Sequence, residues 1–233
     1  METMRKALEA VTSSPLFGIV LCVAAFELGV WLQKKLKTPL CHPLLIAVAL
    51  IIAVLNVFHI SFEDFNEGGQ LVSLFLAPAT AVLALSIYSQ LAVLKKHFLP
   101  ILAGCLAGSL ASMASAFGLC RLFGLDDALT MSMLPKAVTT PIAMGVSEAH
   151  GGIVSVTVAA VIVTGVLGAM AAPALIRLFR VKDPVEAGVA IGACSHAVGT
   201  TRAIELGEVQ GAMSSIAIGV SGLITVLISL FLP

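Results

Sequence analysis

The stretch SMLPKAVTTPIAMG, residues 132–145, places one lysine, two adjacent threonines and two prolines inside a very apolar half of the chain. Pro141 has no amide hydrogen, and Pro135 disfavours helical geometry at the residue before it, so some backbone groups here should lack helical partners. At membrane depth, irregular backbone persists only where protein covers it or where it lines a wet cavity. The sequence therefore predicts a broken helix at Pro135 and Pro141.

The polar side chains at this break are suited to an anion. A helix that restarts inside a membrane presents free amides and the positive end of its dipole. Lys136 adds a compact positive charge, and Thr139 and Thr140 add hydroxyl donors. We expect these three residues to bind a small anionic substrate.

A second stretch, GACSHAVGTTRAIELG at residues 192–207, repeats this chemistry. Gly192 and Gly199 permit unusual backbone conformations and close approach of neighbouring elements. Arg202 carries a planar fork that can hold a carboxylate through two hydrogen bonds. The substrate-binding residues expected in this stretch are His196, Thr200, Thr201 and Arg202.

Each of these residues also has a structural interpretation. Lys136 could extend to the membrane interface, and the threonines could repair backbone hydrogen bonds next to Pro141. His196 could be a structural histidine, and Arg202 could pair with Glu205, three residues later. The candidates for proton coupling are the titratable residues His196, Glu148 and Glu205.

The composition indicates an integral membrane protein. Of the 233 residues, 59% are hydrophobic and only 11% are charged, whereas soluble domains carry roughly 25% charged residues. Abundant glycine and few aromatic residues favour close-packed helices over a barrel. Because about 20 helical residues cross the hydrocarbon core, six segments qualify as spans: residues 16–32, 44–60, 71–88, 98–119, 153–175 and 213–230.

Basic residues predict the orientation of the chain, because cytoplasmic loops retain Lys and Arg. Basic clusters within residues 34–37, 95–97 and 177–182 should be cytoplasmic, and the acidic segment at residues 59–70 should be an external loop. Two further apolar segments, residues 129–147 and 185–206, are interrupted by charge, proline or glycine. Six crossings result if each interrupted element enters and leaves on one side, and eight full crossings are the alternative.

The two interrupted elements also resemble each other in sequence. Residues 136–151 match residues 196–211 at six positions, and residues 120–127 share Arg, Leu, Phe and Asp with residues 176–183. Chance similarity within an apolar chain is the alternative to a true repeat. Inverted repeats with broken helices are the architecture of many secondary transporters. The predicted fold class is an all-α polytopic membrane protein with an inverted repeat of broken or re-entrant elements and six to eight membrane segments.

The sequence argues against several other functions. A formal net charge of zero leaves no basic surface for nucleic acid. The five cysteines are widely separated and common metal-ligand and catalytic motifs are absent, so we expect no metal, no cofactor and no catalytic residue. A membrane-embedded hydrolase that uses Ser195 and His196 is the weakest of the functions considered.

LPKAVTTPIA at residues 134–143 and GACSHAVGTTRAIELGEVQGAMSS at residues 192–215 resemble the signature segments of the LrgB/CidB family. The likeness extends through APATAVLALSIYSQ at residues 77–90 and covers most of the chain. Ala137 stands where serine is common in the family, and Thr201 stands where alanine is common. These differences concern the pocket, so they bear on which substrate is bound.

The resemblance implies a multi-pass protein of the bacterial cytoplasmic (inner) membrane. A single LrgB-like domain would cover residues 1–233, with scaffold spans at about 15–119 and motif-bearing repeats at about 120–175 and 176–233. Some relatives are linked to pyruvate movement, and a plastid relative transports glycolate and glycerate. Others are described as antiholin-like modulators of murein hydrolase export and autolysis.

Two functions follow as expectations from this resemblance. The first is secondary transport of small monocarboxylates such as pyruvate, glycolate or glycerate. The second is an antiholin-like membrane regulator or pore component that acts with an LrgA/CidA-like subunit. The expected partners are therefore a small carboxylate, membrane lipid, an LrgA/CidA-like subunit and further copies of the same chain.

Overall fold

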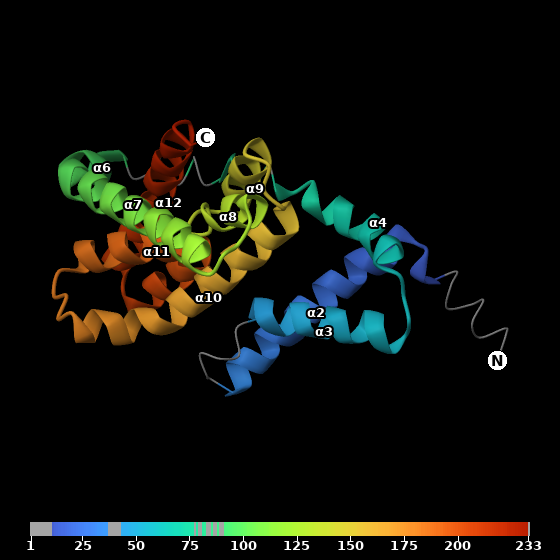
Figure 1. The fold of residues 1–233 in the computed structure, drawn as a ribbon. Coiled ribbons are helices and arrows are strands. Elements are labelled where there is room, and N and C mark those ends of the chain that lie inside the picture. Colours follow the sequence, from blue (N-terminus) through green and yellow to red (C-terminus); the bar gives the residue numbers. More distant parts are fainter. Residues whose placement is uncertain are drawn as a thin grey trace. The chain divides into compact units, whose positions relative to one another are not determined.

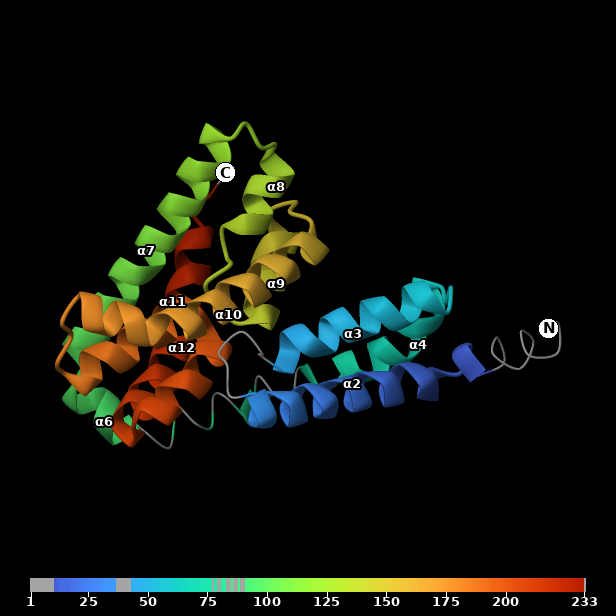
Figure 2. The same ribbon diagram turned by 90° about the horizontal axis from the view of Figure 1, so that it is seen from below.

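The structure, a computed structural model, describes residues 11–36, 43–76 and 91–232, together with Pro78, Ala81, Val82, Leu85 and Tyr88. The regular elements in this part of the chain are helices (Figures 1 and 2). The chain divides into two compact units, Met1–Ala79 and Thr80–Pro233.

The first unit contains three helices: α2 (Pro15–Leu36), α3 (Pro43–Val57) and α4 (Phe62–Ser73). Helix α2 packs against both of the others. A Cβ atom at Gly68 would lie 2.7 Å from the Cα atom of Gly18, and one at Gly29 would lie 2.6 Å from the carbonyl oxygen of Pro43. Small residues thus let the backbones of these helices touch, as is common in membranes.

Most of the acidic segment at residues 59–70 belongs to helix α4, so the prediction that this segment is a loop was wrong. Ser61 caps this helix, because its Oγ accepts a hydrogen bond from the Asp64 amide at 3.1 Å. Glu63 and Asp64 lie in the first turn, where the helix dipole favours negative charge. The acidic residues therefore start a helix here and do not mark a loop.

The second unit holds the helices that carry the two interrupted stretches. They are α6 (Leu91–Lys96), α7 (Phe98–Leu122), α8 (Asp127–Met133), α9 (Thr140–Ala149), α10 (Val154–Leu178), α11 (Pro184–Leu206) and α12 (Glu208–Ser229). Helix α11 packs against α7, α10 and α12, while α8 and α9 pack against α10 (Figure 1). The largest group of buried apolar side chains joins α7, α11 and α12.

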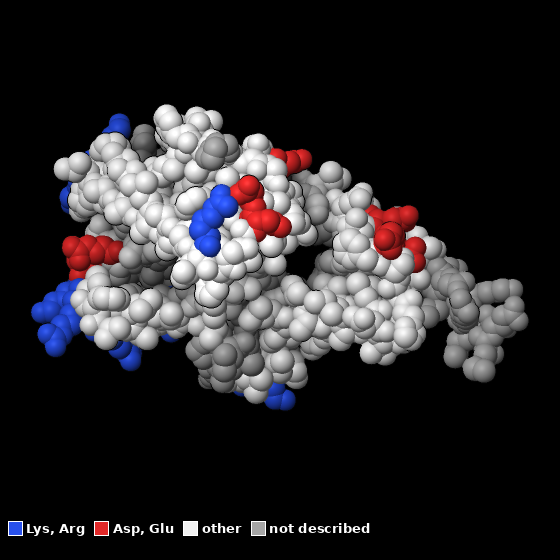
Figure 3. Space-filling model, viewed as in Figure 1, with Lys and Arg blue, Asp and Glu red and all other residues white. Residues whose placement is uncertain are grey.

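Four helices within the described ranges are long and apolar enough to cross a membrane: α2, α7, α10 and α12. They coincide with four of the six predicted spans. The predicted span at residues 44–60 corresponds to α3, which has only 15 residues. Seven of the eighteen residues of the predicted span at 71–88 lie outside the described residues, and this span is not tested. Figure 3 shows broad uncharged surfaces with charged side chains in a few groups, as expected of a membrane protein.

Helices α7 and α10 are both 25 residues long and end in the same way. In each, the amide of the C-cap phenylalanine, Phe123 or Phe179, donates to the carbonyl four residues earlier at 2.9 Å. The next residue, Gly124 or Arg180, has a positive φ of 69° or 54°, as in common helix-terminating motifs. These are the two segments that share Arg, Leu, Phe and Asp in sequence, so their likeness extends to local structure.

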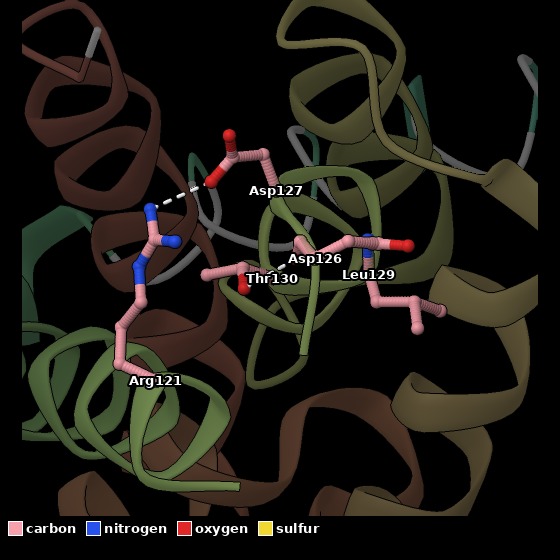
Figure 4. A network of polar contacts seen from close by, with 5 residues as sticks. All are labelled: Arg121, Asp126, Asp127, Leu129 and Thr130. Atoms are coloured by element: carbon pink, nitrogen blue, oxygen red, sulfur yellow. Dashed lines mark hydrogen bonds and ion pairs between the residues drawn. The ribbon is translucent and has the colours of Figure 1, made fainter. Parts of the chain in front are cut away.

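An aspartate caps the helix that follows each of these two ends. Asp126 and Asp183 accept hydrogen bonds from nearby amides at 2.7 Å and 2.8 Å. At the first end, Arg121 of α7 also forms an ion pair with Asp127 at 2.7 Å (Figure 4). Each cap satisfies a backbone amide at the start of the following helix, α8 or α11.

Buried hydroxyls fasten α8 and α9 to the start of α10. Ser132 on α8 accepts a hydrogen bond from the Ile153 amide at 2.7 Å. Thr157 on α10 donates its hydroxyl proton to Ser147 on α9 at 2.7 Å. Ser132, Ser147 and Thr157 are completely buried, so these bonds replace contacts that water would otherwise provide.

Candidate functional site

The first break separates α8 from α9, as the two prolines predict. Helix α8 ends at Met133, and turns occupy residues 134–137. Pro135 is fully buried in this connection, and the amide of Lys136 donates to the Met133 carbonyl at 3.4 Å. Helix α9 begins at Thr140 with Pro141 in its first turn.

Thr139, the N-cap residue of α9, has a buried hydroxyl that is not used. The residue is 5% exposed, and its Oγ1 has no hydrogen-bond partner among the described residues. An N-cap threonine ordinarily accepts from an amide two or three residues later. Pro141, two residues later, has no amide hydrogen, and no side-chain cap bond forms to the amide of Ile142 either. A buried hydroxyl without a partner costs roughly 1–3 kcal/mol. The Thr139 hydroxyl therefore has unused hydrogen-bonding capacity at the start of α9.

The second break is a single residue, His196, within α11. Its φ of 40° and ψ of −145° interrupt a chain that is helical on both sides. Residues other than glycine seldom adopt this conformation, which costs of order 1–3 kcal/mol. The break is held by its own hydrogen bonds: Nε2 donates to the Val161 carbonyl at 2.9 Å, and the Thr200 hydroxyl donates to the His196 carbonyl at 3.1 Å. Ser214 of α12 also lies 2.7 Å from the Thr200 hydroxyl.

Two glycines of α10 make room for this second break. A Cβ atom at Gly165 would lie 2.5 Å from Cε1 of His196. A Cβ atom at Gly168 would meet the side chain of Ser195. The face of α10 that carries Gly165 and Gly168 therefore accepts the backbone turn at Ser195 and His196.

The glycines of α11 have a narrower role than the sequence suggested. Gly192 faces the Ser214 carbonyl oxygen, and Gly199 faces the side chain of Ser195, so both permit close packing. Neither has a positive φ. The unusual backbone conformation was expected at these glycines and lies instead at His196, because the contacts of its ring and carbonyl fix that residue.

Both breaks meet the same part of α10. Val138 of the first break and Val161 of α10 belong to one buried cluster, and the carbonyl of the same Val161 binds His196. The structure thus brings together two stretches that lie about sixty residues apart in sequence.

The predicted site residues fall into three groups by burial. Thr139, His196 and Thr200 are buried. Lys136, Thr140 and Arg202 are half-buried, and Glu148, Thr201 and Glu205 are exposed. Arg202 forms an ion pair with Glu205, which is the structural alternative considered for it, and Thr201 donates to the Val198 carbonyl at 2.7 Å. Within the described ranges, no cluster of three or more His, Cys, Asp or Glu side chains could hold a metal ion.

Two features of this region were not predicted from the sequence. Gly165 and Gly168 are three residues apart in an apolar span, a spacing that indicates close packing on one helix face. His150 directly follows α9 and precedes two glycines, a pattern typical of a helix end. Its ring contacts a carbonyl on α9 and another on α12.

Comparison with known proteins gives consistent matches over nearly the whole chain. The LrgB-like family model matches residues 22–233. The antiholin-like protein LrgB of Bacillus subtilis (strain 168) is 42% identical over 218 residues, which are 93% of this chain and 94% of that protein. Proteins of the same name from Bacillus cereus (strain B4264) and Bacillus anthracis (strain CDC 684 / NRRL 3495) are 42% identical over 226 residues, 96% of this chain and 98% of each relative. No solved structure matches the chain.

Proposed function

From the premise that this chain belongs to the LrgB-like family, we propose that it is an antiholin-like membrane regulator or pore component. It would act in the bacterial cytoplasmic membrane with an LrgA/CidA-like partner and restrain murein hydrolase export and autolysis. The observation that carries this proposal is the similarity to relatives named antiholin-like, which covers both breaks and 93–96% of the chain.

Deletion of the gene in its own bacterium tests this proposal. We expect faster autolysis and more murein hydrolase activity in the culture medium, measured by turbidity and zymography. The wild-type gene should reverse both effects, and Lys136→Ala should not, because it removes the half-buried charge at the first break. Lys95→Ala, on the exposed surface of α6, is the matched control and should behave as wild type. Unchanged autolysis in the deletion strain would contradict the proposal.

A second function, secondary transport of small monocarboxylates, is favoured by the geometry of the breaks. Two interrupted helices that meet beside α10 correspond to the arrangement in which transporters bind substrate near the membrane midplane. In this proposal the carboxylate accepts hydrogen bonds from the Thr139 hydroxyl and the Thr140 amide and lies near the Lys136 ammonium. His196 and Thr200 would close the site from the second break, with His196 as the candidate proton carrier.

The repeated helix ends support an inverted repeat in this second proposal. Each copy would contain a capped start, a break and one spanning helix: α8, α9 and α10 in the first, and α11 and α12 in the second. One crossing per copy would turn the second copy upside down relative to the first. The two breaks would then approach the substrate from opposite membrane faces, as alternating access requires.

Uptake into proteoliposomes distinguishes the two functions. A transporter should take up labelled pyruvate or glycolate in a saturable manner, whereas a pore component should leak bulky solutes only when the LrgA/CidA-like partner is present. For a transporter, Thr139→Val should lower uptake roughly 10- to 100-fold, the effect of losing one hydrogen bond to a charged group. Ser115→Ala, at an exposed hydroxyl on α7, is the control. Normal uptake by Thr139→Val would remove Thr139 from the site.

A further inference from the structure

Helix α11 folds back on itself at its break and consists of two arms, residues 184–195 and residues 197–206. A Cβ atom at Gly199 would lie 3.0 Å from Cγ2 of Ile191 and 3.4 Å from the carbonyl oxygen of Ile191, eight residues earlier. Eight residues of a straight helix span about 12 Å, so these atoms meet only if the second arm returns beside the first. The first arm therefore ends inside the protein, at the buried residue Ser195.

The first arm runs beside α7 and α12 in the same direction as both. Cβ atoms added at four glycines would lie 2.6–3.3 Å from side chains across these two interfaces. The pairs are Gly104 with Val189, Gly108 with Ala193, Gly188 with Met213 and Gly192 with Ala217. Residue numbers rise together in each interface, which is the pattern of parallel helices. The C-terminal end of the first arm therefore lies against the middle parts of α7 and α12, which also pack on each other.

Two serines at this level have buried hydroxyls that are not used. Ser109 on α7 is 2% exposed and Ser221 on α12 is 1% exposed, and neither Oγ has a hydrogen-bond partner among the described residues. The two helices are joined where Sγ of Cys105 donates to the carbonyl oxygen of Ala217 at 3.7 Å. Ser109 and Ser221 each follow one of these residues by four positions, so they lie one turn beyond the same contact and on the same helix faces. The two hydroxyls therefore face the α7–α12 interface at one depth.

Both hydroxyls lie next to the C-terminal end of the first arm. The glycine before Ser109 faces Ala193 of the arm. Ser221 lies one turn beyond Ala217, which faces Gly192 of the arm, and the arm ends within one turn of both contacts. The last carbonyl groups of a helix have no intrahelical amide, and the negative end of the helix dipole lies there. The arm thus presents carbonyl oxygens and partial negative charge where two hydroxyls lack partners.

No charged side chain of α7, α11 or α12 offsets this negative helix end. Helix α7 carries Arg121 in its last turn, where it forms an ion pair. Helix α12 carries Glu208 in its first turn. The charged residues of α11 are Glu186 in its first turn and the Arg202–Glu205 ion pair in the last turns of the second arm. A cation bound beside the two serines would therefore meet oxygen atoms and a negative dipole end without a competing charge from these helices.

We infer that Ser109, Ser221 and the terminal carbonyl groups of the first arm bind one monovalent cation, Na⁺. The C-terminal ends of broken helices coordinate Na⁺ in membrane transporters, and a hydroxyl oxygen supplies lone pairs without adding a charge. Divalent cations are bound mainly through carboxylates, and the three helices place none beside the serines. The site also lacks the Cys and His ligands by which metal sites are recognised in a sequence.

The inference concerns binding of the ion by the folded chain and does not depend on either proposed function. Only the use of a sodium gradient to drive uptake would rest on the second proposed function, secondary transport. Ion binding and uptake are measured separately, so the failure of one can be told from the failure of the other.

Thermal unfolding of the full-length chain in detergent micelles at increasing Na⁺ concentration tests this inference. Choline chloride replaces sodium chloride, so that the ionic strength stays constant. A ligand that binds only the folded chain stabilises it further with each increase in concentration. We expect the unfolding midpoint to rise by about 5–10 °C at a hundredfold excess of Na⁺ over its dissociation constant.

Two substitutions make the result specific to the serines. Ser109→Ala and Ser221→Ala each remove one oxygen ligand, so each should abolish most of the Na⁺-dependent rise. In choline chloride alone, both variants should unfold at or above the wild-type midpoint, because an unpartnered buried hydroxyl destabilises the folded chain. Ser115→Ala, at an exposed hydroxyl of α7, is the matched control and should keep the full rise.

Three results would overturn the proposal. The first is a wild-type midpoint that does not depend on Na⁺. The second is a full Na⁺ response in both Ser109→Ala and Ser221→Ala. The third is an equal loss of stability in these variants with and without Na⁺, which would show that the hydroxyls serve only the packing of α7 against α12.

Discussion

The two breaks of the second unit interrupt a helix by different means. Prolines interrupt the helix at the first break and leave the Thr139 hydroxyl buried without a partner. A strained backbone interrupts the helix at the second, where His196 and Thr200 bind carbonyls and a hydroxyl of the protein itself. Similar sequences with paired threonines therefore produce one break with hydrogen-bonding capacity to spare and one that is satisfied internally. The first break keeps a buried hydroxyl without a partner, and the second uses its imidazole and hydroxyl in bonds within the protein.

The largest effect of a substitution is expected where the second break approaches α12. A Cβ atom at Gly192 would lie 2.9 Å from the Ala217 Cβ atom and would meet the Ser214 carbonyl oxygen. Gly192→Val should therefore lower the free energy of unfolding by about 3 kcal/mol, the upper part of the range for overpacking. Gly145→Ala on α9, with nothing within 4 Å, is the control and should raise it by roughly 0.5–1 kcal/mol. Unfolding by denaturant in detergent micelles measures both values. If Gly192→Val does not lower the unfolding free energy, the packing around Gly192 is loose.

The two buried threonines should respond to the same substitution in opposite ways. Thr200→Val removes two hydrogen bonds and leaves Ser214 without this partner, so it should lower the free energy of unfolding by about 2 kcal/mol. Thr139→Val replaces an unpartnered hydroxyl by a methyl group, so it should leave that free energy unchanged or raise it by up to about 1 kcal/mol. The same unfolding measurement compares them. A loss of stability in Thr139→Val as large as in Thr200→Val would end the distinction between the breaks.

The strained backbone at His196 predicts that glycine at this position gives a more stable protein than alanine, the reverse of the order in an ordinary helix. In an ordinary helix, alanine is more stable than glycine by about 1 kcal/mol. Both His196→Ala and His196→Gly lose the bond to Val161, but only glycine adopts a φ of 40° without strain. We therefore expect His196→Gly to be more stable than His196→Ala by about 1 kcal/mol. The usual order, with alanine ahead, would indicate that the second break straightens when the histidine is removed.

The smallest effect is expected at Arg202. Its ion pair with Glu205 is partly exposed to solvent, and such pairs contribute about 0.5 kcal/mol or less. Arg202→Gln should therefore change the unfolding free energy by about that amount and leave uptake or autolysis unchanged. Loss of function in Arg202→Gln without loss of stability would show that the second break also contributes a charge that binds the ligand. Both breaks would then take part in binding.

The position of the first break was predictable because its causes are local. Pro135 and Pro141 act on the residues next to them, so the end of α8 and the start of α9 follow from the sequence. The spans were predictable for a similar reason, since length and apolar composition suffice for α7, α10 and α12. The same composition misled at residues 59–70, where a cap at Ser61 starts a helix among acidic residues.

The difference between the two breaks was not predictable because its causes are distant in sequence. Thr139 and Thr200 each belong to a pair of threonines, and only the packing of α12 supplies Ser214 to one of them. The strained conformation of His196 depends on the carbonyl of Val161, 35 residues earlier in the chain. Contacts of this kind follow from how the helices are packed, which periodicity and local motifs do not specify.

The hydroxyl bonds that fasten α8 and α9 to α10 set an order for biosynthesis. Ser132 and Ser147 leave the ribosome before Ile153 and Thr157, which supply their partners. Until α10 follows, the Ser147 hydroxyl lacks its partner Thr157, and a segment with this hydroxyl and interrupted backbone would be unfavourable in lipid. The first break therefore reaches its final place in the bilayer only after the insertion machinery has released α10.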